Sequence, residues 1–330
     1  MKNEVNQPCI VCGRSESRLL HALRFPWVGY PGNFDMRECT CCGLLFNSPR
    51  LAETQIERLY DAGYYVFRER ERDAVRRVAQ LASQTIGVAQ QFSDSRDLLE
   101  VGCAKGYLMA LLQARGWSVR GVEIAAGAAE FARSRFGVDV FTGTLEAWVG
   151  SPSFAPAPMV LSTDVIEHVG DPQAFLRAMQ SAVAPRGWLV LGTPNADSDH
   201  RRAHQARWLG FNPFHIFLFA RETLSRLLRE AGFDVVQAYT YANGDPPAPQ
   251  PSTGVRHAVR TVAHVSGLLP LARRARDRML ALADRPVSAQ TLLDQSEAGL
   301  TAYLSSDDAR SQRRVACRGN NLVVIARRTE

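Results

Sequence analysis

Four of the seven cysteines form two Cys-x-x-Cys pairs near the start of the chain, Cys9 with Cys12 and Cys39 with Cys42. A glycine follows each pair, and it lets the backbone turn so that both sulfurs can face one ion. Four thiolates in this spacing predict a closed, structural Zn²⁺ site, whose metal would supply folding energy to a short segment. The alternative is a set of reduced cysteines without metal. Cys41 lies inside the second pair and is not expected to be a ligand.

A second motif is a glycine loop within Asp97 to Tyr107, which reads Asp-Leu-Leu-Glu-Val-Gly-Cys-Ala-Lys-Gly-Tyr. A short apolar run precedes Gly102, and a helical pattern follows Gly106. Glycine lets a backbone approach a ligand closely, and a helix N-terminus offers N–H groups to it. Glu123 ends the next apolar segment, about twenty residues further on, where a carboxylate can accept hydrogen bonds from both ribose hydroxyls of an adenosine. The alternative is a buried turn and an ordinary surface glutamate.

Histidines in three regions could act as a base near neutral pH. His168 lies in Asp-Val-Ile-Glu-His-Val, just after a predicted strand, where a structural role is an equal alternative. His200 and His204 are four residues apart on an expected helix, but a metal site there lacks a nearby carboxylate. His215 lies in the aromatic stretch 208–219.

Short apolar segments alternate with helical patterns from residue 97 onward. This alternation predicts a mostly parallel sheet covered by helices on both faces. The carboxyl ends of parallel strands lie at one edge, so the glycine loop, Glu123, 164–169 and 193–195 should meet there. The expected strands are 98–101, 118–122, 138–141, 159–163, 187–192, 233–241 and 320–327, and the expected helices are 108–115, 126–136, 172–183 and 221–231.

With these motifs the chain resembles class I S-adenosylmethionine-dependent methyltransferases, in the subgroup that includes ubiquinone-type O-methyltransferases and sugar and natural-product methyltransferases. The resemblance covers about residues 50–240 plus the last strand. It implies an α/β, Rossmann-like, seven-stranded sheet and S-adenosyl-L-methionine as cofactor. The sequence departs from the family pattern at Pro158-Met159, where an acid is usual, and at Cys103-Ala104-Lys105, where Lys105 brings a charge near the cofactor's sulfonium.

The resemblance also implies roles for individual residues. His215 is expected to be the base or to orient the acceptor, and His168 is the second catalytic candidate. Tyr65 would approach the methionine part of the cofactor, and 142–145 would hold the adenine. The expected cofactor-binding residues are Tyr65, Glu100, Gly102, Cys103, Gly106, Tyr107, Glu123, Ile124, Thr144, Leu145, Asp164, Val165 and His168.

The 330 residues divide into three expected parts. Residues 1–50 would form a zinc-ribbon-like module, and 51–242 with 319–330 the cofactor-binding core. Residues 243–318 would be a helical insertion between the last two strands, beginning with a proline-rich linker. Three roles stay open for this insertion: a lid, a homodimer element, or a surface that contacts membrane.

Composition narrows the partners. No apolar run is long enough to cross a bilayer, and the polar start of the chain is no secretory signal, so a cytoplasmic protein is expected. The formal charge of +6 is modest for this length, so nucleic acid is not expected as a partner.

These observations predict a methyltransferase acting on a small-molecule hydroxyl of a secondary metabolite, a sugar or a lipid intermediate. Methyl transfer is an in-line displacement, so the protein chiefly positions donor and acceptor, and a hydroxyl must also lose its proton. Three alternatives stay open: C-methylation of a nucleotide sugar, methylation of RNA, and a non-catalytic cofactor-binding regulator.

Overall fold

The structure is a computed structural model that describes residues 8–25, 32–50, 84–242 and 318–329. It also describes nine separate residues: Ala74, Arg77, Val78, Leu81, Ala82, Gln290, Thr291, Asp294 and Ala298. Tyr65, the proline-rich linker and almost all of the expected insertion 243–318 lie outside the described residues. The division into three parts therefore stays a prediction.

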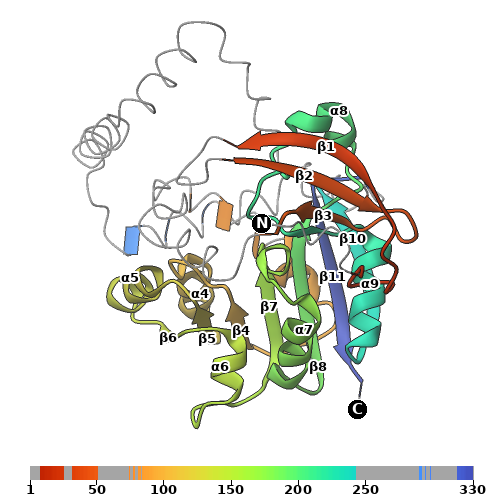
Figure 1. Ribbon diagram of the computed structural model, residues 1–330. Coiled ribbons are helices and arrows are strands. Elements are labelled where there is room, and N and C mark those ends of the chain that lie inside the picture. The colour runs from red at the N-terminus through yellow and green to blue at the C-terminus, as the bar shows by residue number, and fades with distance from the viewer. Residues whose placement is uncertain are drawn as a thin grey trace, which may run out of the picture.

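A seven-stranded sheet forms the centre of the molecule (Figure 1), in the order β10-β11-β8-β7-β4-β5-β6. The chain builds outward from β4 to β5 and β6, then returns to build β7 and β8 on the other side of β4. The last strand, β11, runs antiparallel to both neighbours, and the remaining pairs are parallel. The strands are β4 (Asp97–Val101), β5 (Ser118–Glu123), β6 (Asp139–Thr142), β7 (Ala157–Thr163), β8 (Val183–Pro194), β10 (Phe233–Tyr241) and β11 (Asn321–Arg328).

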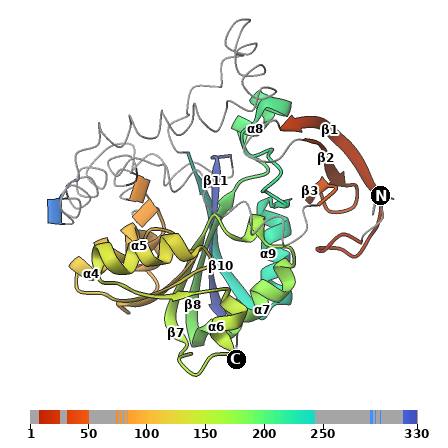
Figure 2. The ribbon, with the colours of Figure 1, turned by 60° about the vertical axis from the view of Figure 1, so that its left-hand side comes forward.

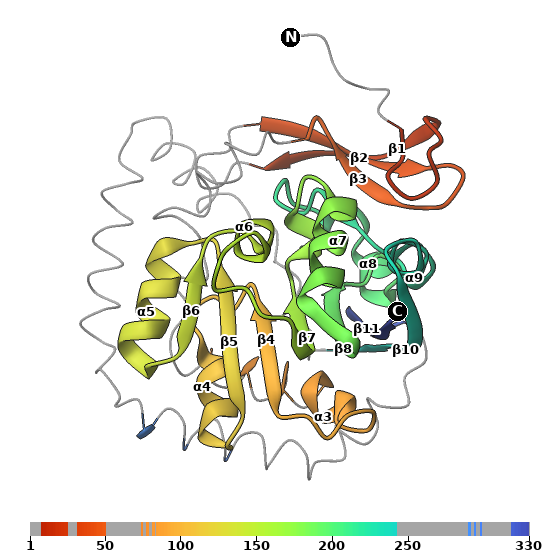
Figure 3. The same ribbon diagram turned by 90° about the horizontal axis from the view of Figure 1, so that it is seen from below.

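Helices cover both faces of this sheet (Figure 3). One face carries α3 (Ile86–Ala89), α4 (Tyr107–Ala114) and α5 (Ala126–Phe136). The other face carries α6 (Leu145–Val149), α7 (Pro172–Ala182) and α9 (Arg221–Glu230). Pro172 at the first turn of α7 suits a helix start, because proline's missing N–H would have no partner there. The predicted α/β architecture is confirmed.

The strands are apolar on both sides because both sides are buried. Leu98 packs into the hydrophobic cluster under α4 and α5, whereas its neighbour Leu99 packs into the cluster under α7 and α9. Val323 and Val324 of β11 divide in the same way, and all four side chains are almost fully buried. Such paired apolar runs are typical of a parallel sheet between two helical layers.

A second, four-stranded sheet joins the N-terminal segment to the core (Figures 1 and 2). Its first three strands are β1 (Ser17–Phe25), β2 (Gly32–Cys39) and β3 (Leu45–Ser48). The fourth, β9 (Phe217–Leu218), comes from the core and pairs antiparallel with β3. Residues 1–50 were predicted only as a zinc-ribbon-like module, and β9 was not predicted, because a two-residue strand carries no periodic pattern.

Three short helical segments lie at the carboxyl edge, between the two sheets. They are η2 (Ile166–His168), α8 (Asp199–His204) and η3 (Gln205–Arg207). Within the described part of the chain, no helix combines the length and the apolar character needed to cross a membrane.

Candidate active site

The glycine loop after β4 requires glycine for steric reasons. Gly102 has a φ of 81°, and a Cβ placed on it would lie 2.3 Å from Cγ2 of Val165. Gly106 has a φ of 72°, and a Cβ there would lie 2.8 Å from the Cβ of Ala132 in α5. Both positions therefore exclude a side chain by backbone conformation and by space. The loop touches the segment after β7, as the sequence predicted for the carboxyl edge of the sheet.

Glu123 is held at the end of β5 by two backbone N–H groups. Its Oε2 accepts from the Ala104 N–H at 2.8 Å, and its Oε1 accepts from the Ala125 N–H at 2.8 Å. Burial raises the pKa of Glu123, and these two N–H groups oppose that shift. Each carboxylate oxygen has a second lone pair, so the residue can still accept from the two hydroxyls of a ribose.

The adenine side of the predicted cofactor site also assembles around Glu123. The neighbouring Ile124 is 44% exposed, which places an apolar side chain where a flat base could cover it. The Gly143 N–H donates to the Glu123 carbonyl at 2.9 Å, so the 142–145 turn lies against this strand end. Thr144 caps α6 through the Ala147 N–H, and Leu145 is buried beneath it. These contacts bring the predicted residues together, and their roles as cofactor ligands stay predictions.

Three other loop residues face the protein interior or a neighbouring helix. The ammonium of Lys105 lies 5.2 Å from the ring centre of Phe131 in α5, a cation–π distance. The Phe131 ring is therefore a favourable partner for the Lys105 ammonium. The ring of Tyr107 packs 5.3 Å from that of Phe136, and Cys103 is buried. Cofactor contact by Tyr107 and Cys103 stays a prediction.

Two more acidic residues lie at this edge, Glu100 within β4 and Asp164 directly after β7. Burial raises the pKa of Glu100 to about 8, with Arg77 opposing the shift and Glu123 adding to it. Asp164 adopts a φ of 55°, and its N–H donates to the Gly192 carbonyl at 3.0 Å. Its side chain is in contact with solvent, yet desolvation by the surrounding protein still raises its pKa against the opposing charge of Arg77.

Next to these residues, Glu167, His168 and His215 form a carboxylate–histidine cluster. One potential ligand atom of each lies within 4.8 Å of the others. Oε1 of Glu167 is 3.7 Å from Nε2 of His168, and the rings of His168 and His215 are 4.8 Å apart in an edge-to-face arrangement. Although His215 is 47 residues beyond His168 in the chain, the Ile216 N–H donates to the Glu167 carbonyl at 2.7 Å and joins the two segments.

Hydrogen bonds fix the tautomers of both histidines. His168 Nδ1 lies 2.9 Å from the Phe214 carbonyl, and His215 Nδ1 lies 2.8 Å from the Gly210 carbonyl. A carbonyl oxygen only accepts, so each Nδ1 carries the proton and each Nε2 is the basic nitrogen in the neutral ring. Donation from Nδ1 to a backbone carbonyl is also how proteins orient histidines that bind metal through Nε2.

Glu167 and His168 are buried and His215 is partly buried, and this burial determines the charge of the cluster. Desolvation and the neighbouring His215 lower the pKa of His168 to about 3, and desolvation lowers that of His215 to about 4. Desolvation and Asp164 raise the pKa of Glu167 well above its usual range. Glu167 Oε2 accepts from the Thr193 hydroxyl at 2.9 Å, whereas Oε1 is buried with no hydrogen-bond partner among the described residues. Both imidazoles are therefore neutral near pH 7.

Two neutral imidazoles beside a buried carboxylate suit either proton transfer or a divalent cation. The donor set of two nitrogens and one oxygen fits ions such as Zn²⁺ or Mn²⁺, and the buried Oε1 of Glu167 needs a positive or hydrogen-bonding partner. The sequence analysis quoted Glu167 within its motif and gave it no role. Its position between a strand end and His168 was the available signal.

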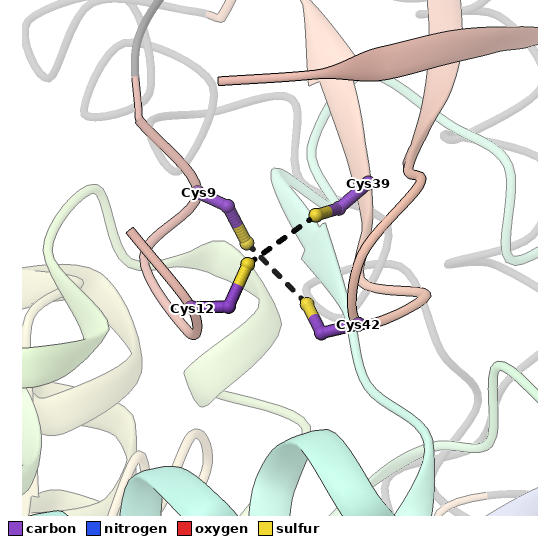
Figure 4. A group of neighbouring side chains, drawn as sticks. All are labelled: Cys9, Cys12, Cys39 and Cys42. Carbon is purple, nitrogen blue, oxygen red and sulfur yellow. Dashed lines mark hydrogen bonds between the residues drawn. The ribbon is translucent and has the colours of Figure 1, made fainter. Parts of the chain in front are cut away.

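The four predicted metal ligands meet in the N-terminal segment (Figure 4). Sγ of Cys9 lies 3.5 Å from Sγ of Cys42, and Sγ of Cys12 lies 3.5 Å from Sγ of Cys39. Sulfurs around a tetrahedral zinc ion with bonds of about 2.3 Å are roughly 3.8 Å apart, so the cluster fits the ion closely. All four are free cysteines, and Cys41 is exposed outside the cluster, as expected.

The glycines after each pair take the conformation that the sequence analysis expected of them. Gly13 and Gly43 have φ values of 72° and 78°, and their N–H groups donate to the carbonyls of Cys9 and Cys39. The turn between Cys9 and Cys12 also contacts the core, because the Gln173 side chain of α7 donates a hydrogen bond to the Ile10 carbonyl at 2.9 Å.

His200 and His204 lie on one face of α8, as predicted, with ring centres 3.9 Å apart. Among the described residues, no third metal-binding side chain joins them within ligand distance. In the part that the structure describes, they therefore lack the third potential ligand that the carboxylate–histidine cluster has.

The strand order, the glycine loop and the pinned carboxylate at the end of β5 together define an adenosyl-cofactor-binding fold of the methyltransferase class. Comparison with known families agrees, since a methyltransferase domain model matches residues 66–238. The chain belongs to this family of methyltransferase domains.

Individual relatives are similar over part of their length. A probable S-adenosylmethionine-dependent methyltransferase of Mycobacterium tuberculosis is 32% identical over 140 residues, which cover 42% of this chain and 49% of that protein. A ubiquinone biosynthesis O-methyltransferase of Ruegeria pomeroyi is 30% identical over 174 residues, 49% of this chain and 68% of that protein. The chain thus spans about half the length of the mycobacterial relative.

Solved structures show a more distant similarity. A SAM-dependent methyltransferase from Archaeoglobus fulgidus gives a TM-score of 0.49 at 17% identity, covering 81% of this chain and 100% of that one.

Proposed function

We propose that this methyltransferase transfers the methyl group to a hydroxyl of a small molecule, such as a secondary metabolite or a sugar or lipid intermediate. The observation that carries the proposal is the carboxylate–histidine cluster at the carboxyl edge of the sheet. A hydroxyl must lose its proton during transfer, and this cluster offers two neutral imidazoles beside the segment after β7, whose Val165 lies against Gly102 of the glycine loop. The similarity to ubiquinone biosynthesis O-methyltransferases supports an oxygen acceptor.

The division of labour follows the geometry. S-adenosylmethionine supplies an activated methyl group. The chain therefore needs only to bind the cofactor, orient the acceptor and deprotonate the acceptor's hydroxyl. Glu123 would hold the ribose, and the backbone of Gly102 to Gly106 would approach the remainder of the cofactor. His215 would orient the acceptor hydroxyl and accept its proton at Nε2, with His168 as the second acceptor.

Glu167 would make this proton transfer more favourable. An imidazole with a pKa of about 4 is a weak base by itself. The Glu167 carboxyl lies beside His168, and His168 contacts His215. Since burial raises the pKa of Glu167 well above its usual range, this carboxyl would readily bind a proton that the imidazoles take up.

A second candidate role for the same cluster is to hold a divalent cation. Glu167, His168 and His215 would be its protein ligands, and the ion would lower the pKa of a bound hydroxyl. Exhaustive dialysis against a chelator separates the two roles. Because a chelator can also remove zinc from the four-cysteine cluster, only restoration of lost turnover by Mn²⁺ or Mg²⁺, which thiolates bind poorly, favours the cation. Unchanged turnover favours the histidine base.

We also propose that the four-cysteine cluster holds a structural Zn²⁺. Metal analysis of the purified protein tests both sites at once. Cys39→Ala should lose about one equivalent of zinc. Glu167→Ala should leave that equivalent in place and would remove a second metal only if the carboxylate–histidine cluster holds one. Full zinc retention in Cys39→Ala would contradict the structural site.

The test of the acceptor is a product analysis. The protein is incubated with S-adenosylmethionine and a panel of catechols, sugars and lipid alcohols, and the methylated atom is located by mass spectrometry and NMR. An O-methyl product is expected. A C-methyl product, methylated RNA, or cofactor binding without turnover on any acceptor would each replace the proposal by the corresponding alternative. A homodimer and membrane contact through residues 243–318 stay predictions.

A further inference from the structure

The loop that carries His215 is fastened by one side chain from the N-terminal sheet. Asn47 of β3 is 2% exposed. Its Nδ2 donates to the carbonyls of Asn212 at 3.1 Å, Pro213 at 3.1 Å and His215 at 2.9 Å. Its backbone N–H also donates to the Ile216 carbonyl at 3.0 Å. A single residue thus contacts four carbonyls in the stretch 212–216.

The chemistry of these contacts is specific to asparagine. Three carbonyl oxygens face the same atom, so this atom must be the amide nitrogen, whose two hydrogens are shared among them. Aspartate has the same shape but presents only acceptors, and serine offers one hydrogen on a shorter side chain. The Asn47 Oδ1 is buried with no partner among the described residues. A buried oxygen without a partner is unfavourable, so the hydrogen bonds that Nδ2 donates, and not the oxygen, explain why asparagine suits this position.

The same strand also clamps the chain just after His215. Leu45 and Phe46 of β3 pair with Leu218 and Phe217 of β9, and β9 starts two residues after the histidine. The His215 Nδ1 also donates a hydrogen bond to the Gly210 carbonyl. The His215 imidazole therefore belongs to a short loop, residues 212–218, that β3 holds in two ways. Asn47 binds carbonyls within the loop, and β9 at its end pairs with β3.

The four-cysteine cluster sits at the turn that leads into this strand. Cys39 ends β2, Cys42 lies in the turn, and the Cys39 N–H donates to the Leu44 carbonyl at 2.9 Å, one residue before β3. The cofactor loop, by contrast, takes its contacts from within the core, with Glu123, Val165 and Ala132 as neighbours. The N-terminal sheet thus contacts one part of the site and leaves the other to the core.

We propose that Asn47 is a positioning residue for His215, and that the N-terminal four-cysteine module is in this way part of the acceptor side of the active site. The inference rests on the proposed role of His215 in methyl transfer. Its structural content, that Asn47 sets the position of the imidazole, stands separately and can be measured without turnover.

The experiment compares Asn47→Asp, which keeps the shape and removes the donors, with Asn47→Ser, a milder change that keeps one donor. The matched control is Glu38→Gln, which breaks the exposed Arg18–Glu38 pair on the neighbouring strand of the same sheet. In Asn47→Asp we expect turnover to fall at least about tenfold, while affinity for S-adenosylhomocysteine stays within about twofold. Asn47→Ser should lie between this variant and the wild type.

A second readout follows the imidazoles directly. In ¹⁵N-histidine NMR spectra, the Asn47 variants should shift the resonances of His215 and of its neighbour His168, and leave those of His200 and His204 in place. Glu38→Gln should shift none of them. If Asn47→Asp does not bind S-adenosylhomocysteine because it fails to fold, Asn47→Ser carries the comparison.

The outcomes are distinguishable. Folded Asn47 variants with unshifted His215 resonances overturn the proposal. Shifted His215 resonances with unchanged turnover also overturn it, because the histidine's position would then not matter to the reaction. If the wild type methylates no hydroxyl acceptor, the proposed function fails, and the resonances alone decide whether Asn47 positions His215.

Discussion

The two sides of this site are built in different ways. The cofactor side comprises the loop 102–106, Glu123 and the turn 142–145, and its contacts join segments that follow one another along the chain. The acceptor side comprises Glu167, His168 and His215, and it draws on Asn47 from a separate sheet. On the cofactor side, consecutive segments are joined by hydrogen bonds that backbone N–H groups donate to Glu123. The acceptor side exists only when distant segments have packed.

This difference teaches where sequence variation can act. The cofactor side is limited by glycine conformation and by one carboxylate, so few substitutions are tolerated. The acceptor side depends on a loop held by a side chain from another sheet. Changes in that sheet can alter the acceptor without touching the cofactor.

The largest expected effect is on the acceptor side. His215→Ala should lower turnover by about 10² to 10⁴, the usual contribution of a general base, with affinity for S-adenosylhomocysteine within about twofold. Steady-state kinetics and calorimetry measure the two quantities, and His204→Ala is the control. Equal losses in turnover and cofactor affinity would show that the two sides are not separable.

The converse substitution acts on the cofactor side. Glu123→Ala should weaken binding of S-adenosylhomocysteine at least about 100-fold, because two hydrogen bonds to a charged acceptor at about 1.5–3 kcal/mol each amount to about 3 kcal/mol or more. Calorimetry measures the affinity, and Glu130→Ala on the exposed side of α5 is the control. The His215 resonances should stay in place. Unchanged affinity would remove Glu123 from the cofactor site.

A third substitution tests the contact between the two sides. Gly102→Ala combines a φ of 81° with a clash against Val165, so it should destabilise the fold by about 1–3 kcal/mol. Val165→Ala should recover part of this loss in a double-mutant cycle followed by denaturant unfolding. Gly127→Ala in α5 is the control, because a Cβ there meets nothing within 4 Å. Additive effects would mean that Gly102 and Val165 do not interact.

The last prediction concerns how the unfolding free energy depends on pH. Glu100 has its pKa raised from 4.5 to about 8, so the folded state binds its proton more tightly than the unfolded state. The associated stability is fully present below pH 4.5 and is lost as the pH rises through about 8. Glu100→Gln should flatten the fall in unfolding free energy between these values, which amounts to at most about 5 kcal/mol for this shift at about 1.4 kcal/mol per pKa unit. Denaturant titrations at several pH values test this, with exposed Glu146→Gln as control. An unchanged slope would contradict the shift.

How far the sequence could predict the molecule follows the same division. The seven core strands, the helices α4, α5, α7 and α9, the glycine loop, Glu123 and the four cysteines were predicted, because each rests on local spacing. The short helix α6 was not predicted. Glu167 was visible within its motif, but its burial beside His215 depends on tertiary packing. Asn47 is one polar residue in a short strand, and no local pattern distinguishes it. Lys105 required the position of Phe131 in α5.

The pairing of β3 with β9 has a consequence for synthesis on the ribosome. Phe46 and its partner Phe217 are 171 residues apart, so β3 emerges long before the strand that covers its edge. At roughly 5–20 residues per second, this interval is on the order of ten to thirty seconds. During that time β3 would present unpaired backbone groups, the condition under which strands associate with other chains. A nascent chain arrested before residue 217 should therefore be more prone to aggregate than one arrested just after β9.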